Sequence, residues 1–401
     1  MENDSKRRFL IVTGEASGDA HAARLVEALK ARGPCRVRGV TGPALEAAGA
    51  ERLARMDDLA VIGFSAVIPR LPRILHTRGR LLAALAEFRP HACILVDAPG
   101  FNLRLGPELK RRGARVFYYI APQVWAWHPE RAAAMARWVD HLAVVFRFEE
   151  AIFREAGVRT TFVGHPLIES LTPEVDTATL RLELALGADQ PVLGLLPGSR
   201  PHEIRHHLAD MLAAARRLQS SRPDLAVVVA LASDRHGPGH APTAGGAEAV
   251  AALERLLPPG RSGEALGIAT LRVTRGRTRV VQATATACAV ASGTATLETA
   301  LQGTPLVIVY RVGAINYAIA RRMVSLERIG LPNIVAGADV VPELIQRDFT
   351  PERLAARLAP YLDDPASRAE QRRGLARVRE GLGDAGASAR AAALVDSLVR
   401  I

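Results

Sequence analysis

One carboxylate of the chain stands directly behind a fully apolar segment. In HACILVDAPGFNLRLGPEL, the run 92–96 is apolar at every position and Asp97 follows it. Side chains just past the carboxyl end of a buried parallel strand face the ligand-binding edge of an α/β sheet. A carboxylate there can serve as the general base for a hydroxyl nucleophile. It can equally accept N–H bonds from the turn at Pro99 and Gly100, and the spacing leaves both roles open.

A second segment has the residues of a diphosphate-binding turn. In VLGLLPGSRPHEIRHHL, Gly198 permits a tight turn after an apolar run, Ser199 supplies a hydroxyl and Arg200 a guanidinium. Pro201 suits the first position of a helix. Exposed amides at a helix N-terminus, next to an arginine, attract phosphate groups. This segment is therefore a candidate site for the diphosphate of a nucleotide.

The same segment also contains HEIRH, the sequence pattern of zinc proteases. Its members are His202, Glu203 and His206. We reject a zinc site, because the motif falls in the first turn after Pro201 and no third ligand is evident. We expect both histidines to be exposed and Glu203 to be favoured by the helix dipole. No metal is predicted for this chain.

Two further strand-to-helix turns carry polar residues. In TGEASGDAHAARLVEAL, Gly14 and Gly18 permit a sharp turn, and Ser17 or Asp19 can cap the following helix. This turn is neither a P-loop nor a full GxGxxG fingerprint, and alone it is typical of an ordinary connection.

The other turn, ASGTATLETAL, places hydroxyls and amides at a helix start through Ser292, Gly293 and Thr294. Glu298 lies about one turn later, where a carboxylate can reach the hydroxyls of a ribose. The same glutamate can instead complete a capping box, and both roles stay open.

An apolar stretch with an arginine rim spans residues 61–88 (VIGFSAVIPRLPRILHTRGRLLAALAEF). Arg70 and Arg73, with two further arginines, face only one acid, Glu87. This composition suits adsorption to an anionic membrane or contact with a phosphorylated lipid. An amphipathic helix packed on its own domain is the alternative, and the prolines at 69 and 72 make a regular core helix less convincing.

The elements that must position these residues alternate along the chain. Short apolar, β-branched runs suit strands buried on both faces of a parallel sheet. The predicted strands are 9–13, 36–40, 92–96, 116–120, 142–146 and 161–163, then 192–196, 226–231, 269–273, 279–281, 288–291 and 306–310. Helical patterns such as 20–31, 103–112 and 203–219 lie between them. The sequence therefore predicts an α/β protein of two doubly wound, Rossmann-like domains facing a ligand-binding cleft.

The length of 401 residues also favours two domains. We place the boundary within 166–190, giving domains 1–168 and 169–384. The helical tail, about 385–401, is expected to pack back on the first domain or to swap between subunits. The Gly/Pro-rich segment 235–246 is expected to be a loop, and no function is assigned to it.

Charge and cysteine content narrow the class of protein. The net charge is +11, but only three of the 52 basic residues are lysine and no basic block stands out. We attribute much of the excess to background composition, and no nucleic-acid-binding signature is found. Three scattered cysteines indicate a reducing compartment. Without a run of about 18 apolar residues or a signal-peptide plan, we expect a cytoplasmic protein with no transmembrane anchor.

Taken together, these segments resemble the lipid-A-disaccharide synthase family over nearly the whole chain. The matching pieces, in family order, are GEASGD (14–19), VIGF (61–64), VDAPGFN (96–102), PQVWAW (122–127), GHPL (164–167), PGSRxxEI (197–204), ASGTATLE (291–298) and LPN (331–333). GEASGD and PQVWAW are specific to the family, whereas PGSR and SGTA-type loops recur among nucleotide-sugar enzymes.

The resemblance implies a GT-B glycosyltransferase that inverts the anomeric centre and needs no metal or other cofactor. The implied donor is UDP-2,3-diacylglucosamine, and the implied acceptor is 2,3-diacylglucosamine 1-phosphate (lipid X). The implied products are the β-1,6-linked lipid A disaccharide 1-phosphate and UDP. The enzyme would be peripheral to the anionic inner-membrane surface, bind no nucleic acid and be able to form a homodimer.

The resemblance also assigns residues. Asp97 matches the essential aspartate of the family, Arg200 its nucleotide-site arginine and Asn333 the asparagine of LPN. Gly198, Ser199, Ser292, Gly293, Thr294 and Glu298 match the turns that hold uridine diphosphate. Glu15, Ser17 and Asp19, together with Arg70 and Arg73, are assigned to acceptor or membrane contact. Many members carry a second acid where this chain has Gly100, so any role of that acid is lost here.

Two other functions share these features. A UDP-N-acetylglucosamine 2-epimerase has the same two-domain plan and a similar uridine site, but it has no use for the arginine-rimmed apolar stretch. A non-catalytic peripheral membrane protein that binds nucleotide sugars would bind without turnover. Release of UDP only when an acceptor is present would exclude both.

Overall fold

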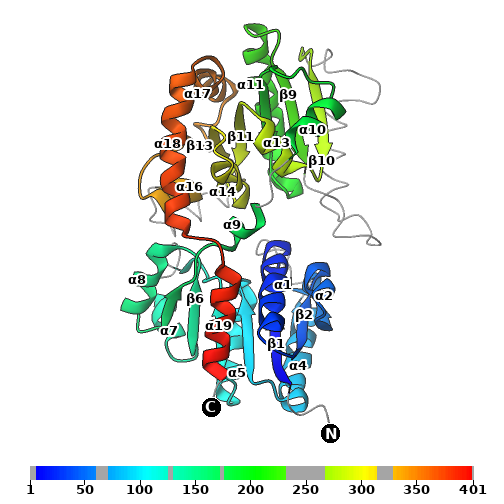
Figure 1. Ribbon diagram of the computed structural model, residues 1–401, viewed down its shortest axis with the longest axis vertical. Coiled ribbons are helices and arrows are strands. Elements are labelled where there is room, and N and C mark those ends of the chain that lie inside the picture. The colour runs from blue at the N-terminus through cyan, green and yellow to red at the C-terminus, as the bar shows by residue number, and fades with distance from the viewer. Residues whose placement is uncertain are drawn as a thin grey trace. The chain divides into compact units, whose positions relative to one another are not determined.

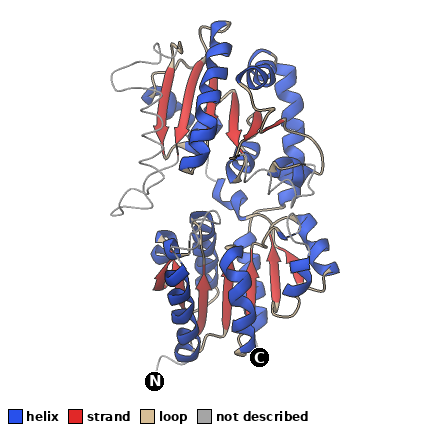
Figure 2. Cartoon of the chain, turned by 180° about the vertical axis from the view of Figure 1, so that it is seen from behind, coloured by secondary structure: helices blue, strands red, loops and turns tan. Residues whose placement is uncertain are grey.

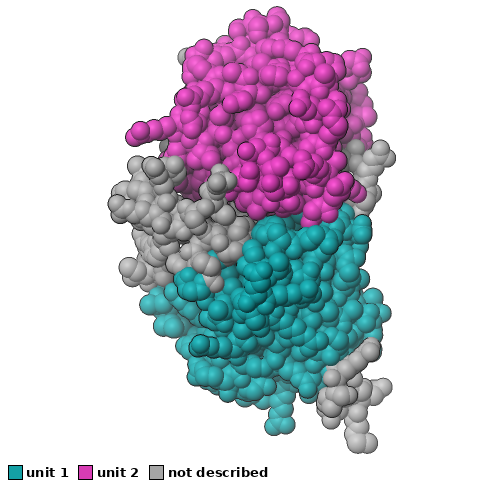
Figure 3. Space-filling model, turned by 90° about the vertical axis from the view of Figure 1, so that its left-hand side faces the viewer, with its two compact units in different colours: residues 1–169, 382–401 teal, residues 170–381 magenta. Residues whose placement is uncertain are grey.

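The computed structural model describes residues 6–59, 71–124, 130–171, 176–231, 267–313 and 328–399. The chain forms two compact units, which are coloured separately in Figure 3. Unit 1 comprises residues 1–169 and 382–401, and unit 2 comprises residues 170–381. Each unit is a parallel sheet with helices on both faces (Figures 1 and 2). The predicted α/β class with two doubly wound sheets is confirmed.

The sheet of unit 1 has seven parallel strands in the order β3-β2-β1-β4-β5-β6-β7. Their bounds are β1 Arg7–Val12, β2 Cys35–Thr41, β3 Glu51–Arg55, β4 Ala92–Val96, β5 Val116–Tyr119, β6 His141–Val144 and β7 Thr160–Phe162. The helices are α1 Ala16–Ala31, α2 Pro43–Ala47, η1 Met56–Asp58, α4 Leu71–Phe88, α5 Pro99–Arg111, α7 Glu130–Met135, α8 Arg147–Glu155, α9 Pro166–Leu171 and α19 Ala387–Val399. The strand order reverses between β1 and β4, so ligands are expected where these two strands end.

Unit 2 repeats this plan with six parallel strands in the order β10-β9-β8-β11-β12-β13. Their bounds are β8 Val192–Leu196, β9 Ala226–Leu231, β10 Leu271–Arg275, β11 Ala287–Ala291, β12 Leu306–Tyr310 and β13 Glu343–Ile345. The helices are α10 Thr177–Glu183, α11 Pro201–Ser220, α13 Thr278–Thr284, α14 Thr294–Leu301, α16 Leu331–Ala336, α17 Pro351–Asp363 and α18 Pro365–Leu382. Here the order reverses between β8 and β11.

Three elements differ from the sequence prediction. The predicted strand 279–281 lies inside helix α13, where Val281 is fully buried. A short β-branched run suits a strand or a buried helix equally well, and here tertiary packing decides for the helix. Strands β3 and β13 were not predicted, because both are edge strands with polar residues and lack a continuous apolar run.

Each sheet is the centre of its own core. Strands β4, β8, β9 and β11 are buried at every position. Burying one such leucine, isoleucine or valine side chain contributes about 1.5–3 kcal/mol relative to leaving it exposed. Two rigid sheets are therefore available to position the residues at their carboxyl ends.

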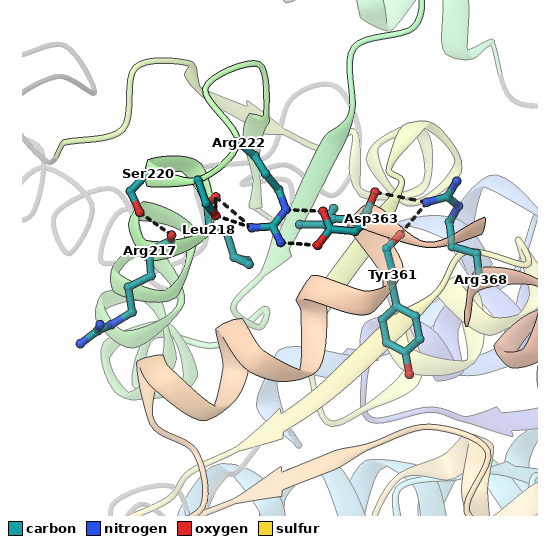
Figure 4. Close-up of polar contacts among 9 residues, drawn as sticks. Arg217, Leu218, Ser220, Arg222, Tyr361, Asp363 and Arg368 are labelled. Atoms are coloured by element: carbon teal, nitrogen blue, oxygen red, sulfur yellow. Dashed lines mark hydrogen bonds and ion pairs between the residues drawn. The ribbon is translucent and has the colours of Figure 1, made fainter. Parts of the chain in front are cut away.

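In unit 2, polar contacts connect the C-terminal ends of α11 and α17 with each other and with the start of α18 (Figure 4). Arg222 follows α11, and its Nε lies 2.6 Å from an oxygen of Asp363 at the end of α17. A second nitrogen of Arg222 contacts the other Asp363 oxygen, and a third lies 3.2 Å from the carbonyl oxygen of Leu218. Arg368 in α18 donates to the carbonyl oxygen of Tyr361 at 3.0 Å. These arginines occupy carbonyl groups that a helix end leaves unpaired.

The arginine-rimmed stretch is a regular helix over its described part. One face of α4 is buried through Thr77, Leu81, Ala84 and Phe88, as expected of an amphipathic helix packed on its own domain. Its first two turns nevertheless leave Leu71 and Leu75 exposed. Arg73 is also exposed, whereas residues 60–70, including Arg70, lie outside the described residues. Among the described residues, no helix is long and apolar enough to cross a membrane.

The C-terminal helix α19 packs against α1 in unit 1 (Figure 1). Asp396 forms ion pairs with Arg7 and Arg32. At the other end, Ser388 donates to both oxygens of Glu169, at 3.0 Å from its amide and 2.7 Å from its hydroxyl. The helix is thus tied to unit 1 at both ends.

Candidate functional site

The reversal of strand order in unit 1 brings two distant motifs together. Gly14 follows β1, and Asp97 and Ala98 follow the neighbouring strand β4. A Cβ atom on Gly14 would lie only 2.7 Å from the Cβ of Ala98, and one on Gly18 would lie 4.0 Å from the Cβ of Asp97. The GEASGD turn and the DAPG turn are therefore packed against each other, and Gly14 is required by their close approach.

The backbone at Asp97 is unusual. Asp97 and Ala98 have φ angles of 47° and 49°, both in the left-handed region. Non-glycine residues rarely adopt this conformation, which costs roughly 1–2 kcal/mol per residue. The two residues turn the chain directly into α5, whose first residue is Pro99. Such strain is typical of functional sites, where surrounding contacts hold it in place.

The environment of the Asp97 side chain raises its pKa. Burial raises the pKa of its carboxyl to about 7, and the negative charge of Glu15 adds to this effect. A hydrogen bond from the Ala98 amide acts in the opposite direction. A base is most effective when its pKa lies near the working pH, so the environment of Asp97 suits proton abstraction near neutrality.

The other residues of the GEASGD turn have different surroundings. Helix α1 begins at Ala16 with Glu15 as its N-cap, so the prediction that Ser17 or Asp19 caps this helix is wrong. Ser17 is exposed on the first turn. Asp19 is buried, and its two oxygens accept bonds from the amides of Gly42 at 2.7 Å and Ala44 at 2.9 Å. Asp19 therefore holds the start of α2.

The close packing at Gly14 predicts a position-specific effect. We expect Gly14→Ala to destabilise unit 1 by about 1–3 kcal/mol, because the new methyl group overlaps Ala98. Gly18→Ala is the matched control, since its methyl group would lie 4.0 Å from Asp97 and from Val96, at ordinary contact distance, and alanine is the better helix former. Thermal unfolding of the two variants tests this. Equal loss of stability would contradict the packing of the two turns.

In unit 2, the PGSR turn joins β8 to α11. Gly198 has a φ of 122°, and Pro201 is the first helical residue. The amides of Ser199 and Arg200 both donate to the same oxygen of Glu203, at 2.9 and 3.1 Å. The Arg200 guanidinium lies 3.3 Å from the other oxygen. A carboxylate of the protein therefore occupies the two amides that were predicted to receive a diphosphate, and Glu203 would have to rotate before these amides could bind one.

Next to this turn, His207 has a role that the sequence did not reveal. Unlike His202 and His206, which are partly exposed, His207 is fully buried. Its Nδ1 lies 2.9 Å from the carbonyl oxygen of Pro197, and its Nε2 accepts a bond from the Arg311 amide at 2.9 Å. Neutral His207 thus links the PGSR turn to the end of β12. Its helical spacing from Ile204 and Met211 was the available signal for burial.

The second turn of unit 2 lies between β11 and α14, adjacent to β8 in the sheet. Gly293 is the N-cap with a φ of 152°, and both Gly293 and Thr294 are exposed, whereas Ser292 is partly buried. Glu298 lies inside α14 and is partly buried, so the capping-box alternative is wrong. Burial raises the pKa of Glu298, while Gln282 and the charge of Arg279 act to lower it.

Asn333 is occupied by bonds within the protein. It is buried, and its Nδ2 donates at 2.7 Å both to the Val341 carbonyl oxygen and to Glu343. Its Oδ1 accepts from the amides of Val340 and Val341 at 2.8 and 2.9 Å. Glu343 in turn accepts from the Gly330 amide. Asn333 therefore fixes the segment that follows α16, and direct contact with a nucleotide would require one of these bonds to break.

Several predicted features lie outside the described residues. They are VIGF, the last three residues of PQVWAW and the loop 235–246. Within the parts of the chain that the structure does describe, no group of three or more His, Cys, Asp or Glu side chains is arranged to hold a metal ion.

Comparison with known structures finds the same architecture in an epimerase and in a glycosyltransferase. A putative UDP-N-acetylglucosamine 2-epimerase from Listeria monocytogenes is similar with a TM-score of 0.63 at 13% sequence identity, covering 98% of this chain and 96% of that one. The calicheamicin glycosyltransferase is similar with a TM-score of 0.59 at 18% identity, covering 98% of both chains. These likenesses show a GT-B-type fold.

Sequence comparison is more specific. The model of the lipid-A-disaccharide synthetase family matches residues 9–242 and 264–396. The lipid-A-disaccharide synthase of Myxococcus xanthus is 44% identical over 394 residues, covering 98% of this chain and 97% of the relative. The enzyme of Anaeromyxobacter dehalogenans strain 2CP-C is 42% identical over 396 residues, covering 98% of each. This chain is a glycosyltransferase and belongs to the lipid-A-disaccharide synthase family.

Proposed function

We propose that the protein transfers a diacylglucosaminyl group from UDP-2,3-diacylglucosamine to 2,3-diacylglucosamine 1-phosphate. The products are the β-1,6-linked lipid A disaccharide 1-phosphate and UDP, formed with inversion. Family membership supports this substrate class. The observation that carries the chemistry is the position of the Asp97 carboxylate at the strand-order reversal of unit 1, where burial raises its pKa to about 7.

In this proposal Asp97 is the catalytic base. Its carboxylate takes the proton of the acceptor 6-hydroxyl as that oxygen attacks the anomeric carbon of the donor. The bond from the anomeric carbon to the diphosphate breaks on the opposite face, and its electron pair leaves with UDP. Burial, with the negative charge of Glu15 adding to it, keeps the pKa of Asp97 raised, so that the protonated form is stable once the transfer has occurred.

Unit 2 binds UDP in this proposal. The Arg200 guanidinium stabilises the charge that develops on the leaving diphosphate, without a metal ion. Ser292, Gly293 and Thr294 contribute hydroxyls and amides at the start of α14, and Glu298 accepts bonds from the ribose. Asn333 acts indirectly, because it holds the segment that follows α16. Glu203 releases the Ser199 and Arg200 amides when the diphosphate enters.

The substrates carry acyl chains, so the proposal includes contact with the anionic inner membrane from the cytoplasmic side. Two exposed leucines of α4, Leu71 and Leu75, are about one helical turn apart, and Arg73, which stands between them in sequence, is exposed as well. Exposed apolar side chains and a cation at the start of one helix suit the interface of an anionic bilayer. Ser17 and Glu15, exposed near Asp97, are the residues that we assign to the acceptor.

UDP release by the purified protein in detergent micelles tests the proposed function. The assay is run with UDP-diacylglucosamine alone and then with diacylglucosamine 1-phosphate, with EDTA present throughout. We expect release only with the acceptor, together with a phosphorylated disaccharide. UDP binding without turnover would support a nucleotide-sugar sensor. Reaction of UDP-N-acetylglucosamine without an acceptor would support an epimerase. Loss of turnover in EDTA would indicate a metal requirement.

The raised pKa of Asp97 predicts the pH dependence of this reaction. The base must be deprotonated to act, so kcat/KM should rise with pH and level off above an apparent pKa of about 7. For an aspartate with an ordinary pKa, the same rise in kcat/KM would occur about three pH units lower. A kcat/KM that stays constant between about pH 5.5 and 8 would contradict the role of Asp97 as a base with a raised pKa.

A further inference from the structure

Two buried side chains bind the main chain of Asp97. Its carbonyl oxygen accepts hydrogen bonds from the Tyr118 hydroxyl at 2.7 Å and from the Asn102 side-chain nitrogen at 2.8 Å. Tyr118 and Asn102 are both 0% exposed. Tyr118 reaches the turn from β5, the strand beside β4, and Asn102 from the first turns of α5. The neighbouring strand β5 and the following helix α5 thus each contribute a donor to the same oxygen.

These bonds act on the strained part of the backbone. The carbonyl group of Asp97 lies between its own left-handed φ and that of Ala98. Fixing this carbonyl fixes the orientation of the peptide that joins the two residues, and hence the direction of the Asp97 side chain. The Asp97 amide is also bonded, to the carbonyl oxygen of Tyr119 at 3.1 Å. The amide and the carbonyl group of Asp97, one on either side of its Cα atom, are therefore both held by hydrogen bonds.

The chemical character of Asn102 argues that the bonds matter beyond packing. Its side-chain oxygen is buried and has no hydrogen-bond partner among the described residues. A buried polar atom without a partner destabilises the fold, so an apolar residue would serve better if only volume were needed. The amide nitrogen, which bonds to Asp97, is the part of the side chain that the site uses.

We propose that Tyr118 and Asn102 are positioning residues that hold the Asp97 turn in its left-handed conformation and so direct the carboxylate at the acceptor hydroxyl. The inference rests on the proposed role of Asp97 as the base. Neither residue touches the reacting atoms in this proposal. Both act through the main chain of Asp97.

The strand β5 offers a matched control. Tyr119 is the next residue, is also fully buried, and points to the opposite face of the sheet. Its hydroxyl makes no hydrogen bond to Asp97, and its main-chain bond to the Asp97 amide does not depend on the side chain. Tyr118→Phe and Tyr119→Phe therefore each remove one buried hydroxyl, but only the first removes a bond to the turn.

The kinetic test compares these two variants in the UDP-release assay. We expect Tyr118→Phe to lower kcat by about ten- to thirtyfold with KM changed less than about twofold, because substrate contacts are intact while the base is misdirected. Tyr119→Phe should keep kcat within about twofold of wild type. Equal losses in the two variants, or an unchanged kcat in Tyr118→Phe, would overturn the inference.

A second readout does not depend on turnover. The Asp97 carboxyl is titrated by carbon-13 NMR in protein with labelled aspartate, its signal being identified by its loss in Asp97→Asn. We expect the midpoint to fall in Tyr118→Phe, because a relaxed turn admits water to the carboxyl, and to stay in place in Tyr119→Phe. If wild type releases no UDP, the proposed function fails, while this titration still decides whether Tyr118 holds the Asp97 turn. Should Tyr118→Phe unfold, Asn102→Ser supplies the same comparison, and an unshifted midpoint there would overturn the proposal.

Discussion

Replacing Asp97 with Asn is expected to lower kcat by about 10²–10⁴-fold, the range that a general base contributes. Asparagine has nearly the same shape and tolerates a left-handed backbone, so the turn with φ angles of 47° and 49° should persist. It cannot take a proton from the acceptor. UDP affinity should remain within about twofold, because the proposed UDP residues belong to unit 2. Single-turnover kinetics and UDP titration measure the two quantities.

The stability of the same variant provides an internal check. The folded-state pKa of Asp97 is about 7, above its ordinary value of 3.8, so the folded state binds the proton more tightly than the unfolded state does. Wild type must therefore lose stability as the pH rises from about 4 through about 7. Asparagine carries no such penalty, and Asp97→Asn should melt at a higher temperature than wild type at pH 8. Full activity of Asp97→Asn, or a lower melting temperature at pH 8, would contradict the assigned role.

The second large effect is expected at Arg200. Arg200→Ala should raise the dissociation constant of UDP and the KM for the donor by about 10–100-fold, since charge-assisted bonds to phosphate contribute about 1.5–3 kcal/mol each. The fold should be retained, because the Ser199 and Arg200 amides can still bond to Glu203 and cap α11. Isothermal titration with UDP measures the change directly.

Arg217 provides the control for this experiment. It lies in the last turn of the same helix α11 (Figure 4). Its side chain is exposed and pairs with Glu352. Arg217→Ala removes the same charge from the protein but lies at the opposite end of the helix. UDP affinity should be unchanged in Arg217→Ala. A similar loss in both variants would indicate a general charge effect, and an unchanged affinity in Arg200→Ala would remove it from the nucleotide site.

Much of the secondary structure follows from the local amino-acid sequence. Strands β4, β8, β9 and β12 have the predicted bounds, because each is a short run of apolar residues. Pro201 begins α11 as expected. The candidate positions also follow from sequence, since Asp97, Arg200 and Ser292 each stand just behind such a strand. The family motifs, which are short and contiguous, were likewise readable without a structure.

What the sequence could not determine depends on contacts between segments far apart in the chain. The packing of Gly14 on Ala98 results from the pairing of β1 with β4, about 80 residues apart along the chain. The pKa of Asp97 follows from burial, which is a property of everything packed around the carboxyl. The same holds for Asn333, whose bonds are all internal. A linear pattern names the residue type at a position, but only the tertiary structure decides which atoms surround it, and these atoms set its charge, its partners and its role.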